Sequence, residues 1–247
     1  MSERRWPTRF VSLGILAAFI AVAFVVVSGP GYRFELLSLR PALLAGVGAA
    51  FIALSAVFML LVGLIASGAS GRMPKAILAL VLSGGIVFQF ANVLLTARSV
   101  PAIHDISTDT VNPPQFDALL GARANAANPP EYAGDDVAKL QAEAYPDIQP
   151  VSLPGVSPAD ALTAAEAAAR SIGLEAIVAQ PAKNLVEGTD VSFWYGYKDD
   201  VVVRATATAD GTRLDIRSKS RVGESDLGAN AQRIRALSEA IKAQTGG

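Results

Sequence analysis

The sequence contains no cysteine and only one histidine, His104, among its 247 residues. The absence of cysteine excludes disulfides, thiol nucleophiles and cysteine-ligated metal sites. A single histidine leaves few candidates for general acid–base catalysis. The composition therefore offers little of the usual catalytic chemistry, and we expect no cofactor and no metal site.

Charge is absent from three long stretches in the first half of the chain, residues 10–28, 41–67 and 76–97. At a rise of about 1.5 Å per residue, each is long enough as a helix to cross a hydrocarbon core about 30 Å thick. The runs predict a membrane domain over residues 1–97 with three transmembrane helices, whose partner is the lipid bilayer. The first run is alternatively a signal peptide, but it is long for that role and no cleavage motif follows it before Pro30.

The loops between these runs differ in their number of basic residues. One side of the membrane receives Arg4, Arg5, Arg9, Arg72 and Lys75, and the other receives Arg33, Arg40 and Arg98. The excess of basic residues predicts that the N-terminus is cytoplasmic. Three crossings then place the rest of the chain in the periplasm of a bacterial inner membrane, as part of a multi-pass protein of the cell envelope.

The second half of the chain has the composition of a domain outside the membrane. Residues 98–247 carry a formal charge of −6, which argues against a nucleic-acid partner. Residues 98–134 are rich in proline, asparagine and aspartate, and predict an extended polar arm. Residues 135–247 are long enough for one domain with its own core.

The order of elements in residues 135–247 predicts an α+β fold. Helices are expected at 135–145, from Ser157 to Gly173, and from Asp226 onward, and strands at 174–179 and 191–197. An Asp210-Gly211 turn predicts a hairpin in which Ala205 lies opposite Ile216 and Arg204 opposite Arg217. We therefore predict an antiparallel sheet covered by helices on one face.

Several polar strings resemble the signature of the domain-of-unknown-function family 1499. They are residues 103–109 (IHDISTD), 112–116 (NPPQF), Gln141 with 145–147, 217–223 (RSKSRVG), 225–228 (SDLG), Asn230 and 233–235. The resemblance covers about residues 100 to 243. It implies no activity, and it carries over no catalytic residue.

Two oxygen-rich groups are candidate binding sites. Asp105, Ser107 and Asp109 alternate onto one face of an extended chain, where their oxygens bind a hard cation or instead form local turns. Ser225 and Asp226 lie where a strand turns into the last helix, whose exposed amides favour an anion unless Asp226 caps the helix itself. His104 beside Asp105 is a poor catalytic pair, because adjacent residues on an extended chain point to opposite sides.

A row of basic residues follows the outer face of the second hairpin strand. Arg213, Arg217, Lys219 and Arg221 have the two-residue spacing of one strand face. The row is a solvated surface, or part of a binding site. The predicted ligand-binding residues are Asp105, Ser107, Asp109, Arg217, Lys219, Arg221, Ser225 and Asp226, with no catalytic residue assigned.

A further hypothesis joins the arm to this row. The arm has few apolar residues to hold it in place, so a carboxylate of Asp105 or Asp109 is expected to pair with Arg217 or Arg221. The preferred function is then a membrane-anchored domain that binds an envelope protein or a small anionic ligand, or acts as an envelope scaffold. The alternative is a hydrolase-like enzyme in which the same carboxylates and arginines, or His104, converge in a concave pocket.

The predicted topology is tested by reporters fused after Gly247. Alkaline phosphatase is expected to be active and ordinary green fluorescent protein to be dark, because only the first folds in an oxidising periplasm. Fluorescence without phosphatase activity would contradict the periplasmic assignment.

Overall fold

The computed structural model describes residues 6–67 and 72–246. Arg4 and Arg5, two of the residues that predict the orientation, lie outside the described residues. The described chain forms two compact units. One contains the N-terminal helices through Thr96 together with Phe193–Gly196, and the other contains Ala97–Ser192 and the chain from Tyr197 onward.

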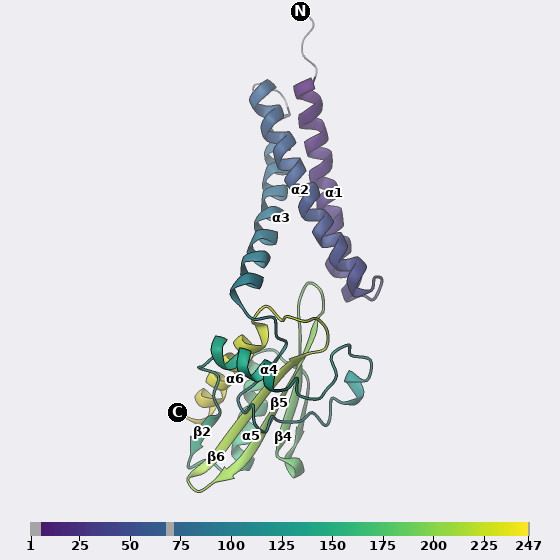
Figure 1. The fold of residues 1–247 in the computed structure, drawn as a ribbon. Helices are drawn as coiled ribbons and strands as arrows, with labels where there is room; N and C mark the ends of the chain where they lie inside the picture. Colours follow the sequence, from purple (N-terminus) through teal and green to yellow (C-terminus); the bar gives the residue numbers. More distant parts are fainter. Residues whose placement is uncertain (1–5, 68–71, 247) are drawn as a thin grey trace, which may run out of the picture. The chain divides into compact units, whose positions relative to one another are not determined.

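The three uncharged runs form three long helices (Figure 1). These are α1 (Trp6–Arg33), α2 (Leu39–Ser67) and α3 (Met73–Ser99), each long and apolar enough to cross a membrane. Glycines let α1 and α2 approach closely: a Cβ at Gly14 would lie 2.7 Å from Leu60, and one at Gly63 would lie 2.8 Å from Val11. Close approach at small residues is typical of helix packing in lipid, and the apolar helices indicate membrane insertion.

The second unit contains an antiparallel sheet of six strands in its described residues. The strands are β1 (Asp105–Ser107), β2 (Val151–Pro154), β3 (Glu175–Gln180), β4 (Leu185–Val191), β5 (Lys198–Thr208) and β6 (Gly211–Ser220). Their order is β1-β6-β5-β4-β3, and β2 pairs with β6 beside β1. The predicted α+β fold with an antiparallel sheet is confirmed.

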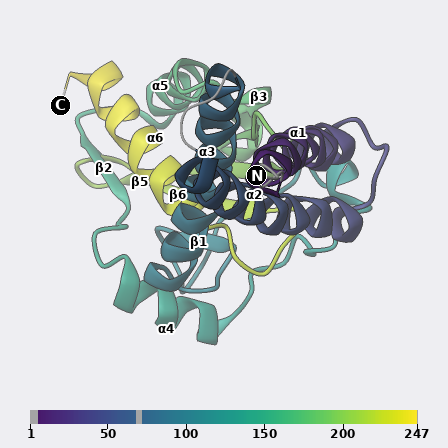
Figure 2. The same cartoon turned by 90° about the horizontal axis from the view of Figure 1, so that it is seen from above.

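Two helices cover one face of the sheet. These are α5 (Pro158–Ser171) and α6 (Ala229–Thr245), which Figure 2 shows on the side of β6 opposite to α4 (Asp135–Ala144). The α5 helix begins as predicted, with the Ser157 hydroxyl accepting a hydrogen bond from the Asp160 amide at 3.2 Å. Buried apolar residues of both helices meet those of β5 and β6, and this layer is the hydrophobic core of the unit.

The arm, residues 98–134, packs on the other face. Besides β1 it contains one short 3-10 helix, η1 (Gly121–Arg123), and is otherwise irregular. Phe116, Leu119 and Arg123 of the arm are nevertheless buried. The sheet is therefore covered on both faces, by helices on one and by an irregular segment on the other.

The strand predicted at 191–197 is wrong. The strand β4 covers Leu185–Val191, and residues 193–195 form a turn. The sequence did not predict this strand because it contains Glu187, Gly188 and Asp190, and none of these residue types favours a β-sheet. The aromatic residues that suggested a strand belong to the loop that follows it. A second short 3-10 helix, η2 (Pro181–Lys183), connects β3 to β4.

The hairpin register differs from the prediction by two residues. Ala205 lies opposite Leu214 and Arg204 opposite Asp215, with Ala209 and Asp210 forming the turn. Gly211 belongs to β6, where a Cβ would lie 2.3 Å from the Leu153 carbonyl of β2. Because the shift is an even number of residues, each side chain keeps its predicted face, and an arginine meets an aspartate instead of a second arginine.

The face assignment leads to a paired mutational prediction. Ala205→Asp buries an unpaired charge in the core and is expected to cost about 3 kcal/mol, whereas Thr206→Asp at an exposed neighbouring position should stay within about 0.5 kcal/mol. Protease resistance of the full chain over a urea series measures both. Equal costs would mean that the two faces are assigned incorrectly.

Candidate functional site

The candidate site is the polar face of β6 and β5, beneath the arm. Alternation along β6 directs Leu214 and Ile216 into the helix-covered core, and directs Asp215, Arg217 and Lys219 to the opposite face. Arg217 and Lys219 are 0% and 1% exposed. The interpretation of the basic row as a solvated surface is therefore wrong for these two residues.

The carboxylate of Asp105 lies at the centre of this face. It accepts hydrogen bonds from Arg217 Nε at 2.8 Å and Nη2 at 2.9 Å, a bidentate pair, and from Lys219 Nζ at 3.0 Å. The Ala133 amide donates a further hydrogen bond at 3.1 Å. Because Asp105 is 0% exposed, this pair is fully withdrawn from water. The predicted pairing of the arm with the basic row is confirmed for Asp105 and Arg217, and we call Asp105, Arg217 and Lys219 the arm clasp.

The two cations of the arm clasp also bind carbonyl oxygens of the arm. Arg217 donates to the Pro114 carbonyl at 3.1 Å and to the Pro130 carbonyl at 3.0 Å, and Lys219 donates to the Glu131 carbonyl at 2.6 Å. The Arg217 guanidinium also lies 5.1 Å from the centre of the Phe116 ring, within the range of a cation–π contact. The arm clasp therefore holds the arm through both its side chains and its backbone.

A second buried cluster surrounds Asp200 on β5. Its carboxylate pairs with Arg221 through two hydrogen bonds of 2.8 Å and with Arg123 of the arm at 2.6 Å. The Thr189 hydroxyl donates to it at 2.7 Å. The Arg123 guanidinium also lies 5.0 Å from the centre of the Phe116 ring, the same ring that Arg217 contacts. This cluster fastens η1 to the sheet.

A third cluster lies nearer the hairpin turn. Asp215 accepts from Arg204 at 2.9 Å and from Arg213 at 2.8 Å, and Arg213 also pairs with Asp109 of the arm at 3.0 Å. Arg204 donates to the Asn112 carbonyl at 2.9 Å. The side chains of Arg204 and Arg213 are 22% and 42% exposed, so this is the most accessible part of the polar face.

Glu187 of β4 fixes the middle of the arm from a buried position. Its carboxylate accepts hydrogen bonds from the amides of Asp117, Ala118 and Leu119 at 2.8 to 3.0 Å. Three successive amides donating to one carboxylate neutralise the charge locally, as an anion does at the start of a helix. The buried glutamate therefore has a structural role.

Burial shifts the pKa of several groups in these clusters. Desolvation lowers the pKa of Lys219 and of Arg123, although Asp105 and Asp200 oppose the shift. Desolvation also opposes ionisation of Asp200, but hydrogen bonds from Arg221 and Thr189 outweigh it and lower the pKa of Asp200. Desolvation and the negative charge of Asp105 raise the pKa of Tyr132 to about 12. The carboxylate of Asp200 is thus held ionised between its two arginines.

The predicted cation group does not converge on a common point. Ser107 and Asp109 form a local turn, in which the Ser107 hydroxyl donates to the Asp109 carbonyl at 2.8 Å and the Asp109 carboxylate accepts from the amides of Val111 and Asn112. Asp105 is engaged by Arg217. Within residues 6–67 and 72–246, no group of three or more acidic or histidine side chains is arranged to hold a metal ion.

The Asp226 carboxylate binds the backbone amides at the start of α6. Asp226 accepts from the amides of Gly228 at 2.7 Å and Asn230 at 3.0 Å, and Ser225 accepts from the Leu227 amide at 3.2 Å. Burial raises the pKa of Asp226. Asp226 therefore caps the helix itself, as the second of the two alternatives predicted. The helix begins at Ala229 and not at Asp226, because residues 226–228 form this turn. A ligand-binding role for Ser225 and Asp226, as for the rest of the predicted set, stays a prediction.

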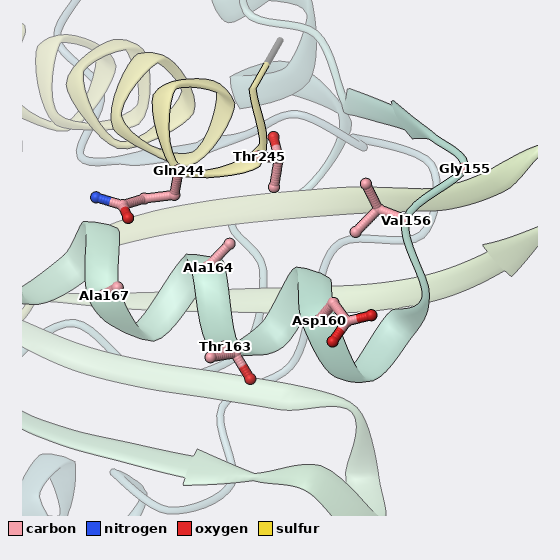
Figure 3. Close-up of a pocket in the computed structure, with 8 residues that line it drawn as sticks. All are labelled: Gly155, Val156, Asp160, Thr163, Ala164, Ala167, Gln244 and Thr245. Carbon is pink, nitrogen blue, oxygen red and sulfur yellow. The ribbon is translucent and has the colours of Figure 1, made fainter.

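A shallow depression lies between α5 and the end of α6 (Figure 3). Its volume is about 410 Å³, and it is lined by Gly155, Val156, Asp160, Thr163, Ala164, Ala167, Gln244 and Thr245. Asp160 accepts a hydrogen bond from the Ser157 hydroxyl at 2.7 Å and takes part in capping α5. None of the predicted site residues lines this depression.

Sequence reasoning missed Arg123, Asp200 and Glu187. Asp200 shares the two-residue spacing of Arg204 along β5, so the alternation of the strand would have placed it on the polar face in either register. Glu187 was missed because its strand was not predicted. Another missed group lies on the helix side, where Arg233 donates to Asp199 at 2.9 Å and to Asn230 at 2.7 Å, and Asn230 also binds Ser220.

The arm clasp is tested by a double-mutant cycle in the full chain. Asp105→Ala leaves two buried cations unpaired and should cost about 3–5 kcal/mol, whereas Arg217→Ala should cost less because Lys219 still neutralises Asp105. The double variant is expected to cost less than the sum of the single changes. When Asp105 and Arg217 are both removed, neither is left as a buried charge without the other. Chymotrypsin cleavage at Phe116 reports release of the arm.

The control for this cycle is Arg170→Ala, which removes an exposed pair with Glu166 on α5. Its effect should be within about 0.5 kcal/mol and should leave cleavage at Phe116 unchanged. Identical cleavage of all the variants would show that the arm does not depend on the clasp.

Comparison with known proteins agrees with the sequence strings. Neither a curated protein nor a solved structure matches the chain significantly. A family profile described as "Protein of unknown function (DUF1499)" matches residues 105–241, which begin at the clasp carboxylate and include its two cations. The chain therefore belongs to the DUF1499 family.

Proposed function

We propose that this protein is a membrane-anchored scaffold or binding domain of the bacterial envelope, in which the arm clasp fixes the arm to the sheet of the α+β domain. The observation that carries the proposal is the burial of Asp105 with Arg217 and Lys219. Asp105 follows the last residue of α3, Ser99, by only six positions. The ion cluster thus lies at the point where the chain leaves its third apolar helix.

Further contacts fix the segment that precedes β1 to the rest of the α+β domain. The Ser220 amide donates to the His104 carbonyl at 2.9 Å, and the Asp226 amide donates to the Ile103 carbonyl at 3.1 Å. The segment between α3 and β1 is therefore hydrogen-bonded to β6 and to the turn before α6. A scaffold benefits from a fixed arm because the binding surface that the arm forms then keeps one shape.

The recognition surface that we propose is the outer side of the arm with the accessible end of the polar face. Arg213 is the most exposed of the ion-paired residues of the basic row, with 42% of its side chain accessible. Its partner Asp109 has 15% of its side chain accessible. Both signs of charge are present, which suits an envelope protein or a small anionic ligand. A partner of this kind would contact the arm without opening the sheet.

The hydrolase-like alternative receives less support from the same geometry. Asp105 and Arg217 converge as that alternative required, but their side chains are 0% exposed. The Asp105 carboxylate already accepts four hydrogen bonds, whereas a general base needs a lone pair directed at its substrate. His104 lies apart from them, with its ring 3.3 Å from the Glu224 carbonyl.

The periplasmic location is part of the proposal. It is supported by the basic residues that flank the apolar helices, five on the side of the N-terminus against three on the other side.

Complementation of a deletion strain tests the proposal. Deletion is expected to increase sensitivity to detergent, and the unchanged chain should restore resistance. His104→Ala should also restore it, because a scaffold does not use the imidazole, whereas Asp105→Ala should fail because the arm is released.

The matched control is Arg170→Ala, which should restore resistance. Immunoblotting of membranes verifies that all variants are present at equal levels. Loss of complementation by His104→Ala at normal levels would favour the enzyme, and a deletion strain with normal resistance would contradict an envelope role.

A further inference from the structure

The β4–β5 loop concentrates aromatic residues that the sheet does not use. Residues 192–197 read Ser-Phe-Trp-Tyr-Gly-Tyr, so four of the six are aromatic in a chain that is 7% aromatic overall. Phe193 and Trp194 are 85% and 40% exposed. Exposing large apolar side chains to water is unfavourable, and adjacent exposed aromatics commonly mark a contact surface.

Strand register places this loop at a particular end of the sheet. Val191 pairs with Lys198 where the loop begins and ends, and the next residue, Asp199, pairs with Ser220. Asp105, the first residue of β1, pairs with Lys219. The loop therefore leaves the sheet at the same end at which the chain arrives from α3.

The length of the connection limits the distance between this end of the sheet and the end of α3. Asp105 follows Ser99 by six positions, and even a fully extended chain over six positions spans only about 21 Å. Contacts from Ile103 and His104 to the turn before α6 and to β6 restrict the connection further. Phe193–Gly196 also belong to the same compact unit as the three apolar helices, where the Tyr195 hydroxyl lies 2.7 Å from the Ser28 hydroxyl of α1.

The side chains of the loop suit the interface of a bilayer. Tryptophan and tyrosine are enriched at the headgroup level, where the ring is buried and its polar group stays hydrated. Lys198 follows the loop and Arg98 ends α3, and both are exposed, so cations are available for lipid phosphates. Aromatic rings and cations together suit a lipid surface, which offers an apolar layer beneath its phosphates, better than a purely polar partner.

We propose that residues 192–197 form a membrane-docking loop, in which Phe193 and Trp194 insert into the headgroup region of the bilayer that holds the chain's own helices. The domain then has two attachments to the membrane, the covalent one through α3 and this loop. The inference does not depend on the binding partner of the domain or on which side of the membrane it lies.

Fluorescence of Trp194 tests the loop in the full chain. The sequence has two tryptophans, Trp6 and Trp194, so Trp6→Phe leaves Trp194 as the single reporter. In proteoliposomes, Trp194 is expected to emit at short wavelength, to lose most of its emission when the lipids carry bromine near the headgroups, and to resist quenching by iodide. The chain with Trp194→Phe, which reports Trp6 at the start of α1, is the control for lipid quenching.

Two results would overturn the inference. Short-wavelength emission without quenching by brominated lipid would mean that Trp194 is buried against protein. Long-wavelength emission with strong quenching by iodide would mean that the loop is in water. A variant with Phe193→Ser in the Trp6→Phe background should reduce the lipid quenching of Trp194, because half of the inserted apolar surface is removed.

Discussion

The structure of the domain outside the membrane depends on the neutralisation of charge on one buried face of its sheet. Arg217 and Lys219 are fully covered, and a buried cation without a partner costs several kcal/mol. Asp105 supplies the carboxylate for both, and it belongs to the arm. The sheet therefore requires the arm as much as the arm requires the sheet.

The composition of the arm suits this role. Proline lacks an amide hydrogen, so a proline-rich segment has carbonyl acceptors to offer without a matching number of donors to satisfy. The carbonyls of Pro114 and Pro130 accept from Arg217 in this way. An irregular segment can thus cover a sheet face without forming a strand. Cationic side chains of the sheet donate the hydrogen bonds to its carbonyls that the amides of a neighbouring strand would otherwise donate.

The strings that relate the chain to its family meet in this part of the fold. Asp105 of the string 103–109 is paired with Arg217 and Lys219 of the string 217–223 across β1 and β6. Their side chains are directed at one another and are satisfied there. This part of the signature therefore has a structural role, and the surfaces that surround the buried cluster are where the function of the family is to be sought.

Much of the architecture follows from the sequence because it depends on local patterns. Uncharged runs specified the three apolar helices, the Ser157-Pro158 cap specified the start of α5, and alternation along β6 specified which side chains share a face. These features need only the period of a helix or strand and the cost of burying a polar group.

Tertiary structure decided the rest. Gly211 lies in β6 beside β2, which leaves no room there for a Cβ, and Glu187 is acceptable in β4 because three amides of the arm approach it. The sequence alone left the basic row as either a solvated surface or a binding site, and the approach of Asp105 turned Arg217 and Lys219 into buried partners. In each case the deciding contact joins residues distant in the chain, and no local pattern encodes such a contact.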